Sequence, residues 1–226
     1  MVRCIALLCG VLLCLGAAAA PATAAEADPA AWMYEPGTVA LVDLTLPRAS
    51  EEALEADPDE YQPGSFSLTV TDGTPGGPRG TKYGPLNVGI RLKGSAGSFV
   101  PLPGKAGFKL KFNFSVNGQK FLGLKKMTLN NMAQDPSMIA ETLAYQAFRA
   151  AGVPGSRSGY AYVRVNGGDY GLYLNLETLD DVALKKRFGA VQHLYEGSYG
   201  ADLTPGGEAA FEIGRASCRE RVSVVV

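Results

Sequence analysis

Two short stretches of the chain place basic residues at every second position. In residues 88–93 and 107–114 these residues alternate with apolar ones, which indicates two strands that each bury one face. If the two strands pair, their basic residues share the opposite face, and these residues are Arg91, Lys93, Lys109 and Lys111. The Gly/Ser-rich connection 94–98 permits close backbone approach and offers N–H groups. A cationic face beside such a connection suits a bound polyphosphate.

The same pattern has a second interpretation. Basic residues on the outer face of a half-buried sheet commonly form a solvated surface, and Gly/Ser connections are common turns. Periodicity by itself does not decide between the two interpretations.

Several other chemistries are excluded by residue type. His193 is the single histidine, and three of the four cysteines, Cys4, Cys9 and Cys14, precede residue 15. We therefore expect no zinc site and no Cys–His or Ser-His-Asp set, and we interpret His193 as structural. The 22 acidic residues slightly outnumber the 21 basic ones, which argues against a nucleic-acid partner.

Both ends of the chain differ from its middle. Arg3, the apolar run 5–15 and the small residues 17–25 predict a signal peptide over residues 1–25. The run is too short to span a bilayer comfortably, so we expect no transmembrane segment after cleavage and a secreted or cell-surface location. The tail 213–226 breaks the composition and resembles a translated sequencing adapter, so we interpret it as non-native. One domain, residues 26–212, remains.

The middle of the chain predicts both strands and helices. Strands are expected at 39–46 and 65–71, and a helix over 49–56 with Ser50 as its cap. Asp135 and Pro136 predict the start of a longer helix that Gly152 ends.

The remaining predicted elements are a third apolar run, a hairpin and a last helix. The third apolar run covers 121–129. Asn166-Gly167 between alternating runs predicts a hairpin, and a short helix is expected at 182–188. Glu141 lies near the edge of the apolar stripe of the longer helix, where the helix dipole alone favours a carboxylate.

Several motifs in this order resemble the CotH (spore coat protein H) kinase family, as a secreted bacterial member represented by its N-terminal part. The residues that carry the resemblance are 89–95 (GIRLKGS), 108–112 (FKLKF), 129–132 (LNNM), 135–138 (DPSM), 143–145 (LAY), 152–154 (GVP), 170–173 (YGLY) and Glu177. The resemblance covers nearly all of residues 39–211.

The resemblance implies an α+β, atypical protein-kinase-like fold: an antiparallel-sheet N-lobe with a packed helix, and a C-lobe largely missing. It implies ATP and Mg²⁺ as cofactors and transfer of the γ-phosphoryl group to serine of an extracellular or coat protein. By resemblance, Lys111 is the phosphate-binding lysine and Glu141 its helix partner, with Lys109 as the competing lysine. Arg91, Lys93 and Ser95 would lie near the phosphate loop, and Glu177 near the adenine.

One departure from the family limits this interpretation. The catalytic and metal-binding aspartates of the family are expected beyond the end of this chain, so the catalytic residues stay unknown and no metal ligand is assigned. Because phosphoryl transfer relies on a positioned Mg²⁺ and on a residue that orients the nucleophile, we expect this fragment not to turn over ATP. The alternative function is a non-catalytic cell-surface or spore-coat interaction module.

Overall fold

A computed structural model describes residues 27–35, 37–71, 77–95 and 97–191, and in addition the backbone of three short strands. These strands form a small sheet in the order β10-β8-β9 and are β8 (Tyr195–Gly197), β9 (Phe211–Ile213) and β10 (Val222–Val224). The predicted signal peptide 1–25, His193 and most of the tail 213–226 lie outside the described residues, so these interpretations stay predictions.

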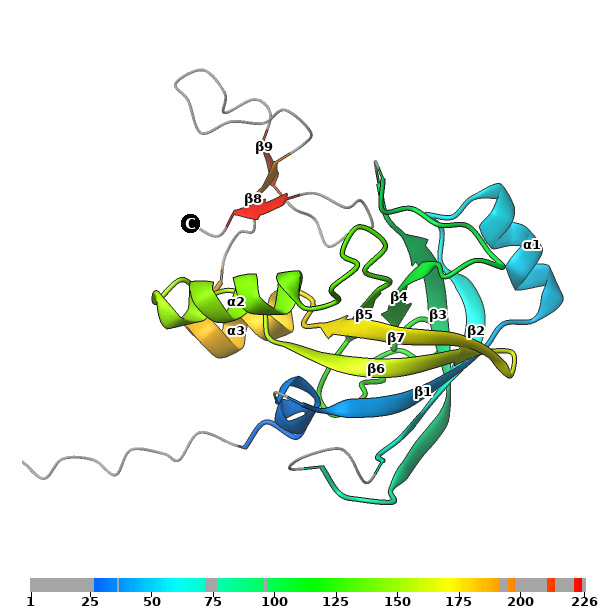
Figure 1. Ribbon diagram of the computed structural model, residues 1–226, viewed down its shortest axis with the longest axis horizontal. Coiled ribbons are helices and arrows are strands. Elements are labelled where there is room, and N and C mark those ends of the chain that lie inside the picture. Colours follow the sequence, from blue (N-terminus) through cyan, green and yellow to red (C-terminus); the bar gives the residue numbers. More distant parts are fainter. Residues whose placement is uncertain are drawn as a thin grey trace, which may run out of the picture.

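Seven strands close into a barrel in the order β1-β2-β3-β4-β5-β7-β6 (Figure 1). The strands are β1 (Val39–Thr45), β2 (Gln62–Thr69), β3 (Lys82–Lys93), β4 (Gly107–Lys111), β5 (Lys126–Asn130), β6 (Ser158–Val165) and β7 (Gly168–Leu176). The α+β class is confirmed. The prediction of an antiparallel sheet is wrong at one place, because β1 and β6 pair in parallel from Val39↔Tyr160 to Leu44↔Val165 and so close the barrel.

Alternating apolar residues of the strands fill the barrel. In β3 and β4 the inward residues Val88, Ile90, Leu92, Phe108 and Leu110 are all at most 1% exposed. Three aromatic rings pack at 4.9–5.3 Å between centroids in the same core, from Phe66, Phe112 and Phe121. Aromatic pairs at such distances add to the stabilisation from burial alone. The interior of the barrel is therefore a packed core.

The predicted strand boundaries shift where the chain turns. The strand predicted at 107–114 ends at Lys111, and the apolar run predicted from residue 121 becomes strand only at Lys126. Between them, Phe121 and Leu124 exchange backbone hydrogen bonds around a turn whose central residues, Leu122 and Gly123, have φ values of 47° and 81°. A tight turn at residues 121–124 thus lies where the sequence predicted the start of the third apolar strand.

The predicted hairpin is confirmed. Asn166 and Gly167 connect β6 and β7 with φ values of 50° and 80°, as the favoured two-residue hairpin turn requires. The Asn166 side chain also accepts a hydrogen bond from the backbone N–H of Leu46 at 2.8 Å and donates one to its carbonyl at 3.0 Å. The turn therefore fastens the hairpin to the residue that follows β1.

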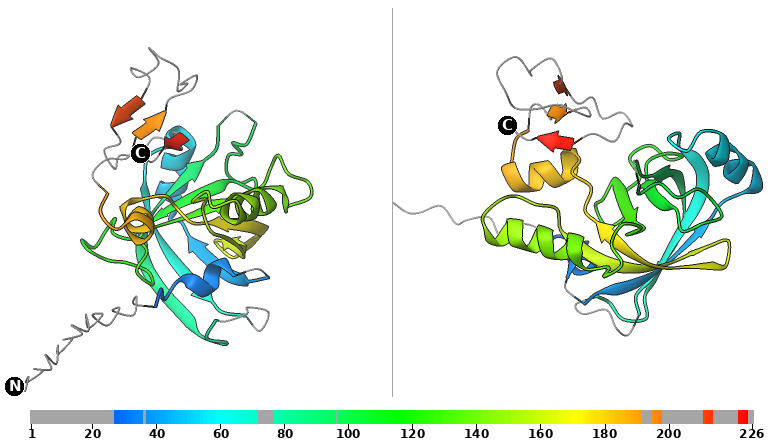
Figure 2. Two further views of the ribbon diagram at one scale, coloured as in Figure 1. Left: turned by 90° about the vertical axis from the view of Figure 1, so that its left-hand side faces the viewer. Right: turned by 45° about the horizontal axis from the view of Figure 1, so that its top comes forward.

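The helices lie at opposite ends of the barrel (Figures 1 and 2). They are the 3-10 helix η1 (Ala31–Tyr34), α1 (Arg48–Ala56), α2 (Ala140–Ala150) and α3 (Asp181–Phe188). Helices α2 and α3 are close together at one end and α1 is at the other. In the described part of the chain, no helix has the length and apolar character to cross a membrane.

Three details of the predicted helices are wrong. The longer helix begins at Ala140 rather than near Asp135, whose carboxylate instead accepts hydrogen bonds from the N–H groups of Ser137 at 3.1 Å and Ala140 at 2.8 Å. The residue before α1 is Pro47, and Ser50 lies within the helix, where its hydroxyl donates to the carbonyl of Pro63 at 2.7 Å.

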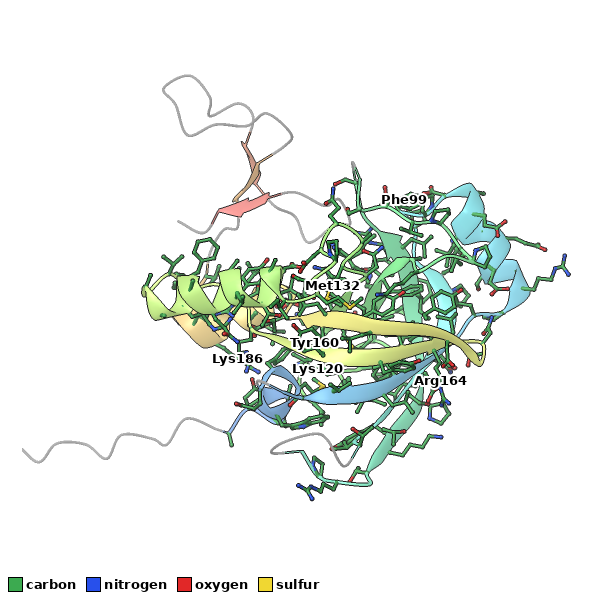
Figure 3. The ribbon with its side chains drawn as sticks, in the orientation of Figure 1. Phe99, Lys120, Met132, Tyr160, Arg164 and Lys186 are labelled. Atoms are coloured by element: carbon green, nitrogen blue, oxygen red, sulfur yellow. The ribbon has the colours of Figure 1, made fainter. Side chains whose placement is uncertain are left out.

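The third detail is the packing of α2, none of whose residues is buried. Leu143 and Phe148 are 55% and 51% exposed. One contact with the barrel is made by Tyr160, whose hydroxyl donates to the carbonyl of Met138 and accepts from Thr142 (Figure 3). Helix α2 therefore makes polar contacts with the barrel and leaves Leu143 and Phe148 about half exposed.

Candidate functional site: a lysine face on strands β3 to β5

The outward side chains of β3, β4 and β5 form one basic surface, which we call the lysine face. It consists of Lys93, Lys109, Lys111, Lys126 and Asn130, while Thr128 on the same side is buried and hydrogen-bonded to the Thr178 hydroxyl. The pairing predicted for the two basic strands is confirmed, with Arg91 opposite Lys109 and Gly89 opposite Lys111. In the next pair, Lys109 is opposite Thr128 and Lys111 is opposite Lys126. Four lysines from three strands therefore project from one side of the sheet.

Arg91 belongs to the same side of β3 but is covered. Its side chain is 2% exposed, and its guanidinium donates to the Asp59 carboxylate at 2.8 Å and lies 5.6 Å from the Tyr61 ring centre. The backbone N–H of Leu92 donates a hydrogen bond to the carbonyl of Pro58 at 3.0 Å. The segment between α1 and β2 thus lies over this part of β3, and Arg91 points to that segment.

Lys93 contacts the end of β5. Its ammonium donates to the Asn130 side-chain oxygen at 2.5 Å. The Asn130 amide nitrogen donates in turn to both carboxylate oxygens of Glu141, at 2.8 and 2.9 Å. The structure therefore joins Lys93 of β3 to Glu141 through a side chain of β5, whereas the resemblance implied Lys111 of β4 as the lysine partner of Glu141.

Lys111 lies at the other end of the lysine face. Its ammonium is 5.7 Å from the Tyr61 ring centre, and its strand partner is Lys126. Lys126 precedes Asn130 by four residues along β5, a strand distance of about 13 Å. Of the three lysines on β3 and β4, Lys93 therefore lies closest to Glu141 along this path, and Lys111 farthest.

The connection after β3 is a tight turn that depends on glycine. Gly94 has a φ of 135°, and a Cβ at this position would lie 2.6 Å from the Cα of Phe99. The carbonyl of Ser95 accepts from the N–H groups of Ser98 and Phe99, and its N–H donates to the Ser98 hydroxyl at 3.1 Å. The N–H of Ser95, which we expected to be available to a phosphate, thus serves the turn.

Two polar residues at this end of the barrel were not assigned a role from the sequence. Asn131 donates to the carbonyls of Ser98 and Lys105, at 3.2 and 2.9 Å, and so fixes the turn to the end of β5. The Lys105 ammonium lies 5.2 Å from the Tyr173 ring centre, and burial lowers the pKa of this lysine. Lys105 lies in the connection between β3 and β4, where the sequence has no periodic pattern, so no sequence signal identified it.

Glu177 takes part in a different arrangement. Its carboxylate is 4% exposed, pairs with Arg157 at 2.7 Å and accepts a further hydrogen bond from Arg187 of α3. Asp28 pairs with the same Arg157 and with Lys186, both at 2.9 Å. Lys186 is labelled in Figure 3. We call these five residues the arginine cluster.

The arginine cluster changes the acidity of its carboxylates. Burial by itself raises the pKa of Glu177, but the hydrogen bonds and charges of Arg157, with the charge of Arg187, outweigh burial and lower it. Both carboxylate oxygens of Glu177 are bonded to arginines, and its place near the adenine stays a prediction. Its contacts instead join β6, β7 and α3.

The two aspartates before and in α3 also have structural contacts. Asp180 caps the helix by accepting from the N–H groups of Val182 and Ala183, at 2.9 and 3.2 Å, and burial raises its pKa. Asp181 pairs with Lys125 at 2.6 Å. Among the described residues, no group of three or more histidine, cysteine, aspartate or glutamate side chains is arranged to hold a metal ion.

These features define a class of protein: an α+β barrel with a lysine face next to a helix glutamate. A family model described as CotH kinase protein matches residues 90–214, which is more than half of the chain. The chain belongs to this CotH family.

Two curated relatives come from Bacillus subtilis (strain 168). The chain is 34% identical over 67 residues to inner spore coat protein H. The matched stretch covers 30% of this chain and 18% of that protein. It is also 34% identical over 68 residues to an inner spore coat protein H-like protein. This second match covers 30% of this chain and 22% of that protein. The matched part therefore spans about a fifth of each relative.

Proposed function

We propose that this chain carries the nucleotide-binding part of a secreted, protein-kinase-like phosphotransferase. In this proposal ATP lies with its phosphates against the lysine face, and the intact protein transfers the γ-phosphoryl group to serine of a coat or surface protein. The observation that carries the proposal is the pairing of β3, β4 and β5, which places Lys93, Lys109 and Lys111 on one side and joins Lys93 to Glu141 through Asn130. The family description and the names of the two relatives support it.

The residues present suit a polyphosphate. Lysine ammonium groups are compact charges that bind phosphate oxygens, and several of them on one rigid sheet need little reordering to do so. When bound, Mg·ATP supplies the transferable phosphoryl group. The described residues hold and orient the phosphates, and we assign no step of the transfer to them.

Within this proposal the lysine nearest Glu141 differs from the one favoured by the resemblance. The path from Lys93 through Asn130 to Glu141 favours Lys93 over Lys111 as the principal phosphate contact. Lys109, diagonal to Lys93 across the β3–β4 pair, is the second contact. Glu177 fixes the segment after β7 rather than contacting the nucleotide.

Binding of Mg·ATP to this chain tests the proposal. A ligand at 100 times its dissociation constant adds about 2.7 kcal/mol to the free energy of unfolding, so we expect a clear rise in the melting temperature in excess Mg·ATP. A Lys93→Ala, Lys109→Ala double variant should lose most of this rise. An Arg48→Ala variant is a suitable control, because Arg48 is an exposed basic residue of α1 that pairs with Glu52 and is not part of the lysine face. No rise in millimolar Mg·ATP would reject the proposal.

The second candidate function is an interaction module of a spore coat or cell surface without catalysis. Both relatives are named as spore coat proteins, and Glu177 is bonded to two arginines instead of being available to a nucleotide. Absence of any Mg·ATP effect in a chain that folds normally would favour this candidate.

A further inference from the structure

Asn130 uses both ends of its side-chain amide. The oxygen accepts from the Lys93 ammonium, and the nitrogen donates to both oxygens of Glu141. An ammonium can only donate, and an ionised carboxylate can only accept. The chemistry of the two partners therefore fixes the orientation of the amide, since a flipped amide would place donor against donor and acceptor against acceptor.

No other residue type of this length satisfies both partners. Alanine would remove all three hydrogen bonds, and aspartate would place a second carboxylate against Glu141. Hydrogen bonds to charged groups contribute more to stability than bonds between neutral groups. The site thus depends on a neutral side chain that accepts on one side and donates on the other.

Asn130 also joins three elements. It ends β5, Lys93 ends β3, and Glu141 lies in the first turn of α2. Because no residue of α2 is buried, polar contacts such as this one have a large share in fixing the position of the first turn. Thr142 and Met138 make the neighbouring contacts, both to the Tyr160 hydroxyl.

We propose that Asn130 is a positioning residue that holds the Lys93 ammonium and the first turn of α2 in fixed relation to the nucleotide phosphates. The inference rests on the proposed function and extends it to a residue that need not touch ATP. An ammonium has three donors, so Lys93 can contact a phosphate while one of its donors stays on the Asn130 oxygen. Asn130 keeps its two hydrogen bonds to Glu141 at the same time, so the first turn of α2 stays in place.

A charge-swap series tests this inference in the full chain. Asn130→Asp should weaken the binding of Mg·ATP by about tenfold or more, because two carboxylates then face each other. The double variant Asn130→Asp, Glu141→Gln restores the pattern, since the introduced carboxylate accepts both from Lys93 and from the introduced amide. We expect it to recover most of the lost affinity in isothermal titration with Mg·ATP. Asn87→Ala is the matched control, an exposed asparagine on the same strand as Lys93.

A second readout needs no nucleotide. In nuclear magnetic resonance spectra, the Lys93 side-chain ammonium signal should move in Asn130→Asp and return toward its original position in the double variant. If the double variant recovers neither the affinity nor the signal, the inference is overturned. If the ammonium signal behaves as expected but the unmodified chain does not bind Mg·ATP, the proposed function fails and the positioning of Lys93 by Asn130 stands.

Discussion

The lysine face and the arginine cluster both consist of charged side chains next to helices, but their surroundings differ. In the arginine cluster, Asp28 and Glu177 each face two cations, and the Glu177 side chain is 4% exposed. On the lysine face, Lys93, Lys109, Lys111 and Lys126 are half-buried and project from one side of the sheet. A covered cluster in which each carboxylate meets two cations depends on every one of its partners, whereas a sheet face that gathers four lysines suits a ligand of the opposite charge.

The largest effect should follow from breaking the arginine cluster. Glu177→Ala leaves Arg157 and Arg187 without their shared carboxylate in a buried place, and loss of one partner of a buried ion pair costs about 3–5 kcal/mol. We expect a decrease of this size in the free energy of unfolding, measured by urea titration. Glu52→Ala is the control, because Glu52 is 60% exposed and its loss should change stability by less than about 0.5 kcal/mol. Equal effects of the two variants would contradict the structural role of Glu177.

Acid should weaken the same cluster. The pKa values of Glu177 and Asp28 in the folded chain are below their ordinary values of 4.5 and 3.8, so their contribution is present above these values. It is lost as the pH falls through the lower folded-state values. The difference in stability between the unmodified chain and Glu177→Gln should therefore be greatest near neutral pH and narrow below pH 4.5. A difference that does not change with pH would show that the carboxylate charge is not what stabilises the cluster.

Replacing lysines of the lysine face should change the free energy of unfolding less than Glu177→Ala does, but it should clearly weaken the binding of Mg·ATP. Lys93→Ala should weaken Mg·ATP binding about tenfold or more, because it removes a charge-assisted contact. Lys111→Ala should weaken it less, since Lys111 lies at the far end of the face beside Tyr61. Isothermal titration of both variants gives the comparison. A greater loss for Lys111→Ala would restore the assignment that the family resemblance favours.

The smallest effect should come from the exposed face of α2. Leu143 is 55% exposed, so Leu143→Ser should change the free energy of unfolding by less than about 0.5 kcal/mol. Leu110→Ala, within the barrel and fully buried, should cost about 2–5 kcal/mol in the same urea titration. A large loss for Leu143→Ser would show that this face of α2 is covered in solution.

Local patterns in the sequence predicted the paired basic strands and the hairpin at Asn166-Gly167, because both depend on neighbouring residues. The closure of the barrel by β1 and β6 was not predictable in this way, since the two strands are about 120 residues apart and no local rule sets their pairing. The position of Asp135 before Pro136 predicts a helix cap, but Met138 has a φ of 58°, which interrupts any helix there. Helix α2 therefore starts later.

The candidate site was predicted in part. Alternation predicted that Arg91, Lys93, Lys109 and Lys111 share a side, but the covering of Arg91 by Asp59 and Tyr61 depends on a segment about 30 residues earlier. The link through Asn130 depends on three elements meeting at one point, and periodicity carries no information about it. Glu177 has the same limitation, because both of its arginines come from other elements.

Mapping the binding site of Mg·ATP by nuclear magnetic resonance is the most direct test of the lysine face. In a titration of the isotope-labelled chain, we expect the largest shifts of backbone and side-chain signals at Lys93, Gly94, Lys109 and Asn130. The signals of Glu177 and Arg157 should shift little. No saturable shifts at the lysine face, or largest shifts within the arginine cluster, would contradict the account.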